Sequence, residues 1–515
     1  MSKLISRHLV GSYLVVIFIF TTTISKATGN PGKDKALHTY LSQYENVLGT
    51  SMELKISASS PSRAAEAERN VLQEISRLSK ILSTYDDASE FSRWQKTMNL
   101  PVPVSRELFD VMQLFDTWKM RTKGAIDASA EIITRLWKKA ALSQHLPDQK
   151  DINEAISQVK QTHWVLDADL RTATHLDHAP LMFNSFVKSY IIKHSVEAAL
   201  KPGGVAAIIL NIGGDLVISG DVSEHVSISD PKADAENEKP LDVLLIQNKA
   251  VATSGNYRRG ENIEGRWYSH IVDPRTGLPA DNILSATVVS DDATEAGVLA
   301  TAFNVMPVSE SVQLASGIPG IQYLIITREG ERITSKGWKQ LETAAGKKEK
   351  EGNAESGKNV GKAKWNNGFE MIINLEINTQ KEGFSKRPYL AIWVEDSTHA
   401  AIRNIAMWHG SDRYVPELKS WYLKYRSVYN SDMNFKNSVT SATRPAGKYT
   451  VQWDGKDDKG NYVAPGKYII KIEISREHGT YQLMRQEIDC NEMAKQINLP
   501  GNIEISSVSF DYRKK

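Results

Sequence analysis

The chain contains one cysteine, Cys490, among its 515 residues. A single cysteine cannot form an intramolecular disulfide, so the fold depends on its hydrophobic cores for stability. We expect Cys490 to be a small buried side chain rather than a nucleophile or a metal ligand.

The chain also lacks an excess of charge of either sign. It has 63 Lys and Arg against 61 Asp and Glu, a formal net charge of +2. This balance gives no electrostatic reason to expect nucleic acid or anionic lipid as the main partner. With 41% hydrophobic residues the chain can bury sizeable cores, and its length favours two to four domains at roughly 150 residues each.

No hydrophobic run is long enough to favour a membrane-spanning helix. The longest, Leu9–Phe20, is shorter than the ~20 residues that such a helix needs. Basic residues precede it, and small residues, Ser25 and Ala27, follow it, which is typical of a secretory signal. We therefore predict a signal peptide over residues 1–27 and an exported, periplasmic protein with no stable membrane span after cleavage. An uncleaved N-terminal anchor is the alternative.

Large apolar residues are almost absent from Ala344 to Lys364, a stretch of Gly, Lys, Glu and Asn. Such a composition cannot form a core and predicts a flexible linker over 344–364. The chain is thereby divided into a first domain at 35–343 and a second at 365–512.

The first domain combines helical and strand patterns. Apolar residues at helical spacing predict helices over Ser62–Ser83 and Ser105–Met120. Short β-rich runs predict strands at Ala206–Leu210, Asp242–Gln247, Ser285–Val289 and Tyr323–Thr327. This mixture predicts an α+β or α/β layer architecture, and we assign α+β.

The second domain has an alternating, aromatic-rich texture. It predicts an all-β, immunoglobulin-like sandwich with strands at Phe369–Ile377, Tyr389–Val394, Tyr449–Trp453 and Tyr468–Ile474. Between the last two strands, Asp454–Asn461 is rich in turn residues. Its aspartates lack the spacing of a calcium loop, so we predict a hairpin turn there.

Three clusters in the first domain carry residues suited to chemistry. Glycines at Asn211–Asp215, after a strand, let backbone N–H groups approach a phosphate, although an ordinary glycine turn is the commoner case. Ala252–Tyr257 is a second turn with small and hydroxyl residues. His270 precedes the stiff turn Asp273–Gly277, and a histidine near a carboxylate can act as a general base, a structural histidine being the alternative.

Taken in order, these clusters resemble the FAD:protein FMN transferases, the ApbE family, across roughly Val47 to Leu341. The closest match is Tyr268–Gly277, which reads Y-S-H-I-V-D-P-R-T-G. The other matching segments are Leu48–Thr50, Leu82–Tyr85, Ser89–Arg93, Thr122–Asp127, Leu136–Trp137, Gly213–Asp215 and Thr253–Tyr257.

The resemblance implies a reaction and a site. Members of the family move FMN from FAD to a serine or threonine hydroxyl of a target protein, with release of AMP and help from a divalent cation, usually Mg2+. The resemblance places His270 and Asp273 at the phosphates and the acceptor hydroxyl, and makes Thr301 and the Val187 carbonyl metal ligands. The flavin nucleotide would contact Tyr85, Lys188, Gly213, Gly214, Asp215, Ser254, Gly255 and Tyr257. The partners implied are FAD and an acceptor, either an exported protein or the chain's own C-terminal domain.

Two departures from the family pattern fall at the site. In the first, the family's D-L-G-G-I-A-K-G-Y reads M-F-N-S-F-V-K-S-Y over Met182–Tyr190. Met182 stands in place of the aspartate, and Asn184 and Ser185 put side chains where the family has two glycines. A milder change puts Gln95 where the family has asparagine.

The family's A-D-A-L-A-T reads A-G-V-L-A-T, with Gly297 in place of the carboxylate that binds the cation. Two readings stay open: an enzyme with a rearranged Mg2+ site that recruits Asp292 or Glu295, or a catalytically degenerate flavin- or protein-binding module.

The second domain resembles a poorly characterised periplasmic family found behind ApbE-like domains. The matching residues are Lys386–Trp393, Ser441–Tyr449, Trp453–Gly455 and Gly466–Tyr468. Targets of the transferases carry a pattern close to D-G-x-S/T-G-A-T, and Asn437–Thr443 has a similar order of small and hydroxyl residues. Thr443 is therefore a candidate flavin acceptor presented in cis, with a plain loop as the alternative.

Overall fold

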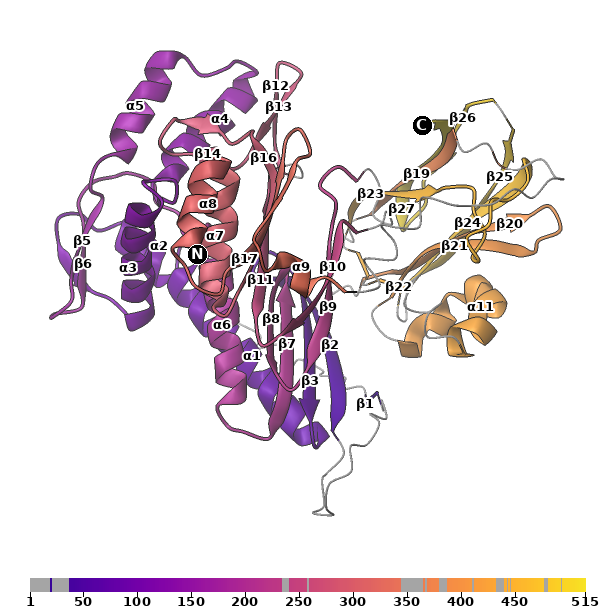
Figure 1. Ribbon diagram of the computed structural model, residues 1–515, viewed down its shortest axis with the longest axis horizontal. Coiled ribbons are helices and arrows are strands. Elements are labelled where there is room, and N and C mark those ends of the chain that lie inside the picture. The colour runs from indigo at the N-terminus through magenta and orange to yellow at the C-terminus, as the bar shows by residue number, and fades with distance from the viewer. Residues whose placement is uncertain are drawn as a thin grey trace, which may run out of the picture. The chain divides into compact units, whose positions relative to one another are not determined.

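The computed structural model describes residues 19–20, 37–233, 240–256, 259–343, 365, 368–378, 387–409, 412–431, 440–441, 443–444, 446–476, 480–491 and 493–515 (Figure 1). Most of the predicted signal peptide and the whole of the predicted linker lie outside these residues. Contacts divide the chain into two compact units, residues 1–231 with 242–350, and 232–241 with 351–515. None of the described helices is both long and apolar enough to cross a membrane.

The first unit is built on a nine-stranded sheet in which every neighbouring pair is antiparallel. In spatial order its strands are β1 (Ile19–Phe20), β2 (His38–Val47), β3 (Thr50–Ala58), β7 (Val205–Ile212), β8 (Asp215–Gly220), β11 (Ala250–Gly255), β16 (Ile283–Ser290), β17 (Gln322–Thr327) and β18 (Arg332–Thr334). A separate hairpin pairs β9 (Ser223–Ile228) with β10 (Asp242–Gln247).

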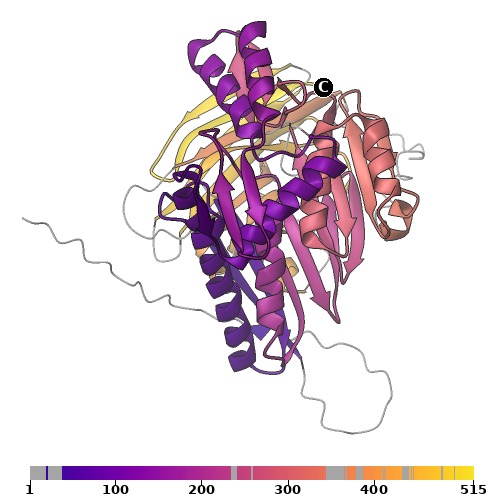
Figure 2. The ribbon, with the colours of Figure 1, turned by 90° about the vertical axis from the view of Figure 1, so that its left-hand side faces the viewer.

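Helices cover one side of this sheet, and Figure 2, which turns that side toward the reader, shows them crossing in front of the strands. Those that form the site are α1 (Pro61–Leu82), α6 (Val187–Leu200) and α7 (Ala293–Val305). Helix α1 begins where the Ser60 hydroxyl accepts a hydrogen bond from the Arg63 amide, with Pro61 in the first turn. Its apolar stripe is buried against the sheet and α6, in one continuous core.

The remaining elements extend this layer. They are α2 (Glu90–Gln95), α3 (Arg106–Arg121), α8 (Val308–Ser316) and the small sheet of β4 (Pro101–Pro103), β6 (Thr172–His175) and β5 (Trp164–Asp167). The short helix α9 (Trp338–Leu341) lies apart from this layer, where the Trp338 indole donates to Asp242 at the start of β10. A satellite core joins α4 (Ala130–Ser143) and α5 (Gln149–Val159) to β12 (Gly260–Ile263), β13 (Arg266–Ser269) and β14 (Val272–Asp273), which pairs with β15 (Leu278–Pro279). His270 lies in the link between β13 and β14.

The second unit is a two-sheet sandwich. One sheet has the order β23 (Gly447–Trp453), β19 (Phe369–Ile377), β27 (Ile505–Lys514), β26 (Lys495–Pro500); the other has β22 (Thr440–Ser441), β21 (Ala401–Trp408), β20 (Tyr389–Asp396), β24 (Gly466–Ser475), β25 (Tyr481–Cys490). Side chains from both sheets share one core, which includes Cys490 at 1% exposure. Burial raises the pKa of the Cys490 thiol to about 12, and its prediction as a buried side chain is confirmed.

The predicted α+β class, with a β-rich second domain, is confirmed. One element was not predicted: α11 (Lys419–Ser431), which follows the short 3-10 helix η1 (Asp412–Glu417) and packs aromatic side chains onto β20 and β21. The hairpin turn predicted at Asp454–Asn461 is confirmed, because Lys456 and Tyr462 form an antiparallel bridge and the Asp457 amide donates to the Asn461 carbonyl. The long strands on either side, β23 and β24, nevertheless belong to different sheets. The segment connects one sheet to the other. Its turn is stabilised by the Asp457 carboxylate, which accepts hydrogen bonds from the amides of Lys459 and Asn461.

Candidate functional site

The turn between β7 and β8 requires its two glycines for conformational reasons. Gly213 and Gly214 have φ angles of 58° and 92°, in the region where other residues are strained. A Cβ on Gly213 would also lie 2.6 Å from Cγ2 of Thr50. The Asn211 side chain accepts a hydrogen bond from the Gly214 amide at 3.1 Å, so the turn is held rigidly at the end of its hairpin.

Asp215, directly after this turn, is buried and held from two sides. The Ser189 hydroxyl donates to its Oδ2 at 2.8 Å, and the Lys188 ammonium lies 3.3 Å from the same oxygen. Lys188 also donates to the Gly213 carbonyl at 3.4 Å. Burial raises the pKa of Asp215 above its usual value, while Lys188 and Ser189 act in the opposite direction. The structure therefore brings together four of the predicted nucleotide contacts, Lys188, Gly213, Gly214 and Asp215.

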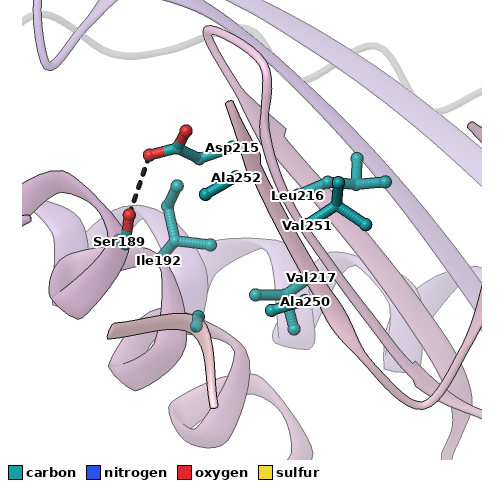
Figure 3. Close-up of a pocket in the computed structure, with 9 residues that line it drawn as sticks. Ser189, Ile192, Asp215, Leu216, Val217, Ala250, Val251 and Ala252 are labelled. Atoms are coloured by element: carbon teal, nitrogen blue, oxygen red, sulfur yellow. Dashed lines mark hydrogen bonds between the residues drawn. The ribbon is translucent and has the colours of Figure 1, made fainter. Parts of the chain in front are cut away.

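Figure 3 shows the residues that line a small recess at this point, Ser189, Asp215, Ala252 and Ala293 among them. The recess has essentially no room even for a water molecule, whereas pockets that enclose a drug-sized ligand usually measure ~300–1,000 Å³. A flavin nucleotide cannot be enclosed there and would have to lie over the glycine turn and the start of α6.

Tyr85 is tied to the altered segment that precedes α6. It is 79% exposed, and its hydroxyl accepts a hydrogen bond from Nδ2 of Asn184 at 2.6 Å. The same nitrogen lies 2.8 Å from the Met182 sulfur, and the Thr84 hydroxyl donates to Oδ1 of Asn184 at 3.4 Å. Asn184, which stands where the family pattern has glycine, thus joins the loop after α1 to the loop before α6.

Gln95 steadies that loop from a second direction. Its side-chain amide donates to the Leu181 carbonyl at 3.2 Å and accepts from the Leu181 amide at 3.3 Å. This pair of bonds resembles a short piece of sheet and fixes the backbone two residues before Phe183. The glutamine that replaces the family's asparagine is therefore part of the loop's support.

On β11, the predicted contacts Ser254 and Gly255 lie half-buried in the large sheet, while Tyr257 lies outside the described residues. The Ser254 carbonyl accepts a hydrogen bond from Nδ2 of Asn304 on α7 at 3.1 Å. Asn304 is 1% exposed, and its Oδ1 has no hydrogen-bond partner among the described residues. Sequence reasoning missed Asn304, although an asparagine directly after the apolar pair Ala302 and Phe303 was a visible signal.

His270 has a fixed tautomer. Its Nδ1 lies 2.9 Å from the carbonyl oxygen of Arg259, which can only accept, so Nδ1 carries the proton and Nε2 the lone pair. The residue as a whole is exposed. Desolvation of the ring and the Arg259 charge nevertheless lower the pKa of His270, against the opposing effect of the hydrogen bond. A neutral imidazole whose Nε2 carries the lone pair has the form of a general base.

Asp273 is occupied within its own turn. The Arg275 guanidinium donates to both of its oxygens, at 2.9 Å from Nε and 2.8 Å from Nη2, and continues to Glu310 at 3.0 Å. The Trp137 indole donates to the Gly277 carbonyl at 2.9 Å, which anchors the end of the turn to α4. These contacts favour a positioning role for Asp273, and its predicted catalytic role stays a prediction.

The predicted metal ligands lie at the facing parts of α6 and α7. Val187 begins α6, and the Thr301 hydroxyl on α7 donates to the Ser185 carbonyl at 2.9 Å. A Cβ on Gly297 would lie 2.2 Å from the Ser189 hydroxyl oxygen, so the position left by the family's carboxylate is filled.

Asp292 and Glu295, the two carboxylates that could replace the family's aspartate, bind other groups. Asp292 caps α7 through the Glu295 amide and lies 2.5 Å from the Lys193 ammonium, contacts that lower the pKa of Asp292 despite its burial. Glu295 accepts from the Ser290 hydroxyl at 2.9 Å. Within the described ranges, no three His, Cys, Asp or Glu side chains are grouped to hold a metal ion. The residues present do not fit a Mg2+ ion, which prefers carboxylate oxygens.

Thr443, the candidate flavin acceptor in the second unit, is 8% exposed. Its carbonyl accepts a hydrogen bond from the Arg387 guanidinium at 2.7 Å, and burial lowers the pKa of Arg387 to about 10. The Thr443 hydroxyl is therefore not presented to another molecule unless this segment moves.

Comparison with known proteins adds to this geometry. Residues 48–325 match the sequence profile described as the ApbE family, and residues 370–507 match one described as a predicted periplasmic protein (DUF2271). The chain is 26% identical over 295 residues to an FAD:protein FMN transferase of Salmonella typhimurium, which covers 55% of this chain and 83% of the relative. It is 25% identical, with the same coverage, to the enzyme of that name from Escherichia coli K12.

Two solved structures resemble the first unit. A crystal structure of the ApbE protein from Thermotoga maritima has a TM-score of 0.53 and 25% sequence identity, covering 59% of this chain and 99% of that one. The flavin transferase ApbE from Vibrio cholerae has a TM-score of 0.50 and 20% identity, covering 59% of this chain and 100% of that one. At that identity the second likeness shows the fold alone.

Proposed function

Because this chain belongs to the ApbE family, we propose that its first unit transfers FMN from FAD to a serine or threonine hydroxyl of an exported protein and releases AMP. The names of its relatives, FAD:protein FMN transferase, support the reaction class. The observation that carries the proposal is His270, a neutral, exposed histidine whose Nδ1 is held by the Arg259 carbonyl.

In this reaction, Nε2 of His270 accepts the proton of the acceptor hydroxyl as its oxygen attacks the FMN phosphorus of FAD. The new oxygen–phosphorus bond forms while the pyrophosphate bond to AMP breaks, and AMP leaves as a phosphate monoester. The proton passes from His270 to solvent or to the departing phosphate. Lys188, beside the glycine turn, supplies positive charge where charge develops on the phosphates.

No step is assigned to Mg2+, because the residues at its expected place do not fit it. The Lys188 ammonium lies beside the glycine turn, at 3.4 Å from the Gly213 carbonyl. Asp273 and Arg275 keep the turn after His270 stiff and so hold the histidine in place. Tyr85, held by Asn184, offers an exposed ring on which a flavin can stack.

A second candidate is a flavin- or protein-binding module that has lost catalysis. It is favoured by one observation, namely that Asn184 and Ser189 place side chains where the family pattern has bare backbone. The two candidates differ in chemistry, since a binding module retains FAD intact whereas a transferase consumes it.

The similarity of the second unit to a predicted periplasmic family supports an exported protein with residues 1–27 as its signal peptide. The burial of Thr443 favours a separate exported protein as the acceptor over transfer in cis. The cis route is tested by the intact mass of the chain after coexpression with a source of FAD. An FMN-sized increment that disappears in Thr443→Ala supports transfer in cis, and no increment rejects it.

The transfer itself is tested with FAD and an acceptor peptide that carries the D-G-x-T-G-A-T pattern, read out by peptide mass. Wild type should add FMN and His270→Ala should not. His145→Ala is the matched control, since it removes another exposed histidine from the same unit. If wild type adds no FMN with or without Mg2+, the transferase proposal fails, and retention of intact FAD then supports the binding module.

A further inference from the structure

The contact between α6 and α7 is unusually close at one point. Gly297 on α7 faces Ser189 on α6, and a Cβ on the glycine would lie 2.2 Å from the Ser189 Oγ and 2.8 Å from its Cβ. Separations below 3.0 Å are essentially never seen for real Cβ atoms. Position 297 therefore admits only glycine as long as position 189 carries a side chain.

The Ser189 side chain is fixed in this place. It is 2% exposed, and its hydroxyl donates to Oδ2 of Asp215 at 2.8 Å. The Lys188 ammonium, 3.3 Å from the same carboxylate oxygen, gives that carboxylate a second partner. Rotation of Ser189 away from Gly297 would break its hydrogen bond and leave a buried carboxylate oxygen less well satisfied.

Both members of this contact differ from the family pattern, and in opposite senses. On α6, Ser189 stands in place of the glycine of the family's K-G-Y. On α7, Gly297 stands in place of the family's cation-binding aspartate. Relative to the pattern, α6 gains a side chain at Ser189, and α7 loses one at Gly297, the position it faces. The Asp215 carboxylate beside Ser189 is already paired with Ser189 and Lys188. The Thr301 hydroxyl and main-chain carbonyls carry no net charge for a hard cation.

We propose that Ser189 and Gly297 are a compensating pair that closes the α6–α7 junction to a divalent cation. The inference rests on the proposed function in one respect, that the α6–α7 junction is the place where the family's cation would bind. Under that function, the nucleotide's phosphates meet the Lys188 ammonium instead of a metal ion. The aspartate can return at position 297 only when Ser189 is also replaced by glycine.

The test is a titration of the full-length chain with Mn2+, in which free Mn2+ is measured by its paramagnetic resonance signal. Wild type and Thr301→Val should bind the same amount, because no ion lies beside Thr301. Ser189→Gly/Gly297→Asp should gain one saturable site per chain. Ser189→Gly alone opens the space without adding a carboxylate, and because Asp215 stays paired with Lys188 it should gain none.

Thermal melting of the same proteins tests the compensation without any metal. Gly297→Asp should melt below wild type, and the double variant should melt above Gly297→Asp. Weaker Mn2+ binding by Thr301→Val than by wild type would overturn the proposal. So would a double variant that gains no site or melts no higher than Gly297→Asp. No FAD is used, so a chain that fails to transfer FMN can still pass this test.

Discussion

The two sides of the candidate site, the segment around His270 and the α6–α7 junction, match the family pattern to very different degrees. At Tyr268–Gly277 the sequence follows the pattern, His270 is held by a main-chain carbonyl, and Asp273 is held by Arg275 of its own turn. At the α6–α7 junction the sequence departs from the pattern, and the Ser189 side chain lies where the pattern has only glycine. A family can therefore be recognised from one side of a site while the other side has changed its chemistry.

The largest expected effect tests the side that matches. His270→Ala removes the only group assigned to take the hydroxyl proton, and we expect FMN transfer to fall by about 10²–10⁴-fold. The melting temperature should stay close to that of wild type, because the residue as a whole is exposed and the contact given up by its ring is the hydrogen bond to the Arg259 carbonyl. Both are measured on one preparation, with His145→Ala alongside. A loss below tenfold would remove His270 from the reaction.

The next effect tests the side that has changed. Gly297→Ala forces a methyl group against Ser189, and overpacking of this kind costs about 1–3 kcal/mol. Alanine recovers about 1 kcal/mol of that through its better helix propensity. We expect a net loss of unfolding free energy, measured by urea denaturation.

The matched control for that loss is a double-mutant cycle with Ser189→Gly. The penalty of the alanine should shrink once the serine side chain is gone, because the two positions are in direct contact. Equal penalties in the two backgrounds would contradict the close approach of α6 and α7.

Features of the fold that depend on neighbouring residues could be predicted from the sequence, whereas features that depend on contacts between distant residues could not. The strand Phe369–Ile377 was predicted with the bounds it has in the structure, since alternation is a local signal. Helix α11 was missed, although Trp421, Tyr425 and Tyr429 recur at helical spacing, because their β-forming side chains sit in a strand-rich region.

Longer-range features were not accessible from local pattern. The Asp454–Asn461 segment has the chemistry of a turn, but its residues do not tell whether the chain stays in one sheet or crosses to another. Ser189 and Gly297 were each visible as departures from the family. Only the packing of α6 on α7 shows that one side chain fills the space of the other.

A smaller effect separates positioning from catalysis on the His270 side. Asp273→Asn keeps the shape of the turn but weakens its charged hydrogen bonds with Arg275, which are worth about 1.5–3 kcal/mol in such settings. We expect lower stability and a loss of transfer well short of that in His270→Ala. A variant with wild-type stability and the full loss of His270→Ala would make Asp273 a catalytic residue.

The smallest expected effect is a displacement of the pH profile. His270 acts as a base only when neutral, and its pKa is lowered in the folded protein by desolvation and the Arg259 charge. The rate should therefore hold as pH falls and decline only below the ordinary histidine pKa of about 6.5. The measurement is kcat/KM for FMN transfer across the acid range, with melting followed over the same range to exclude unfolding. An acid limb above pH ~6.5 would contradict the desolvated ring, and an unchanged limb in His270→Ala would assign it to another group.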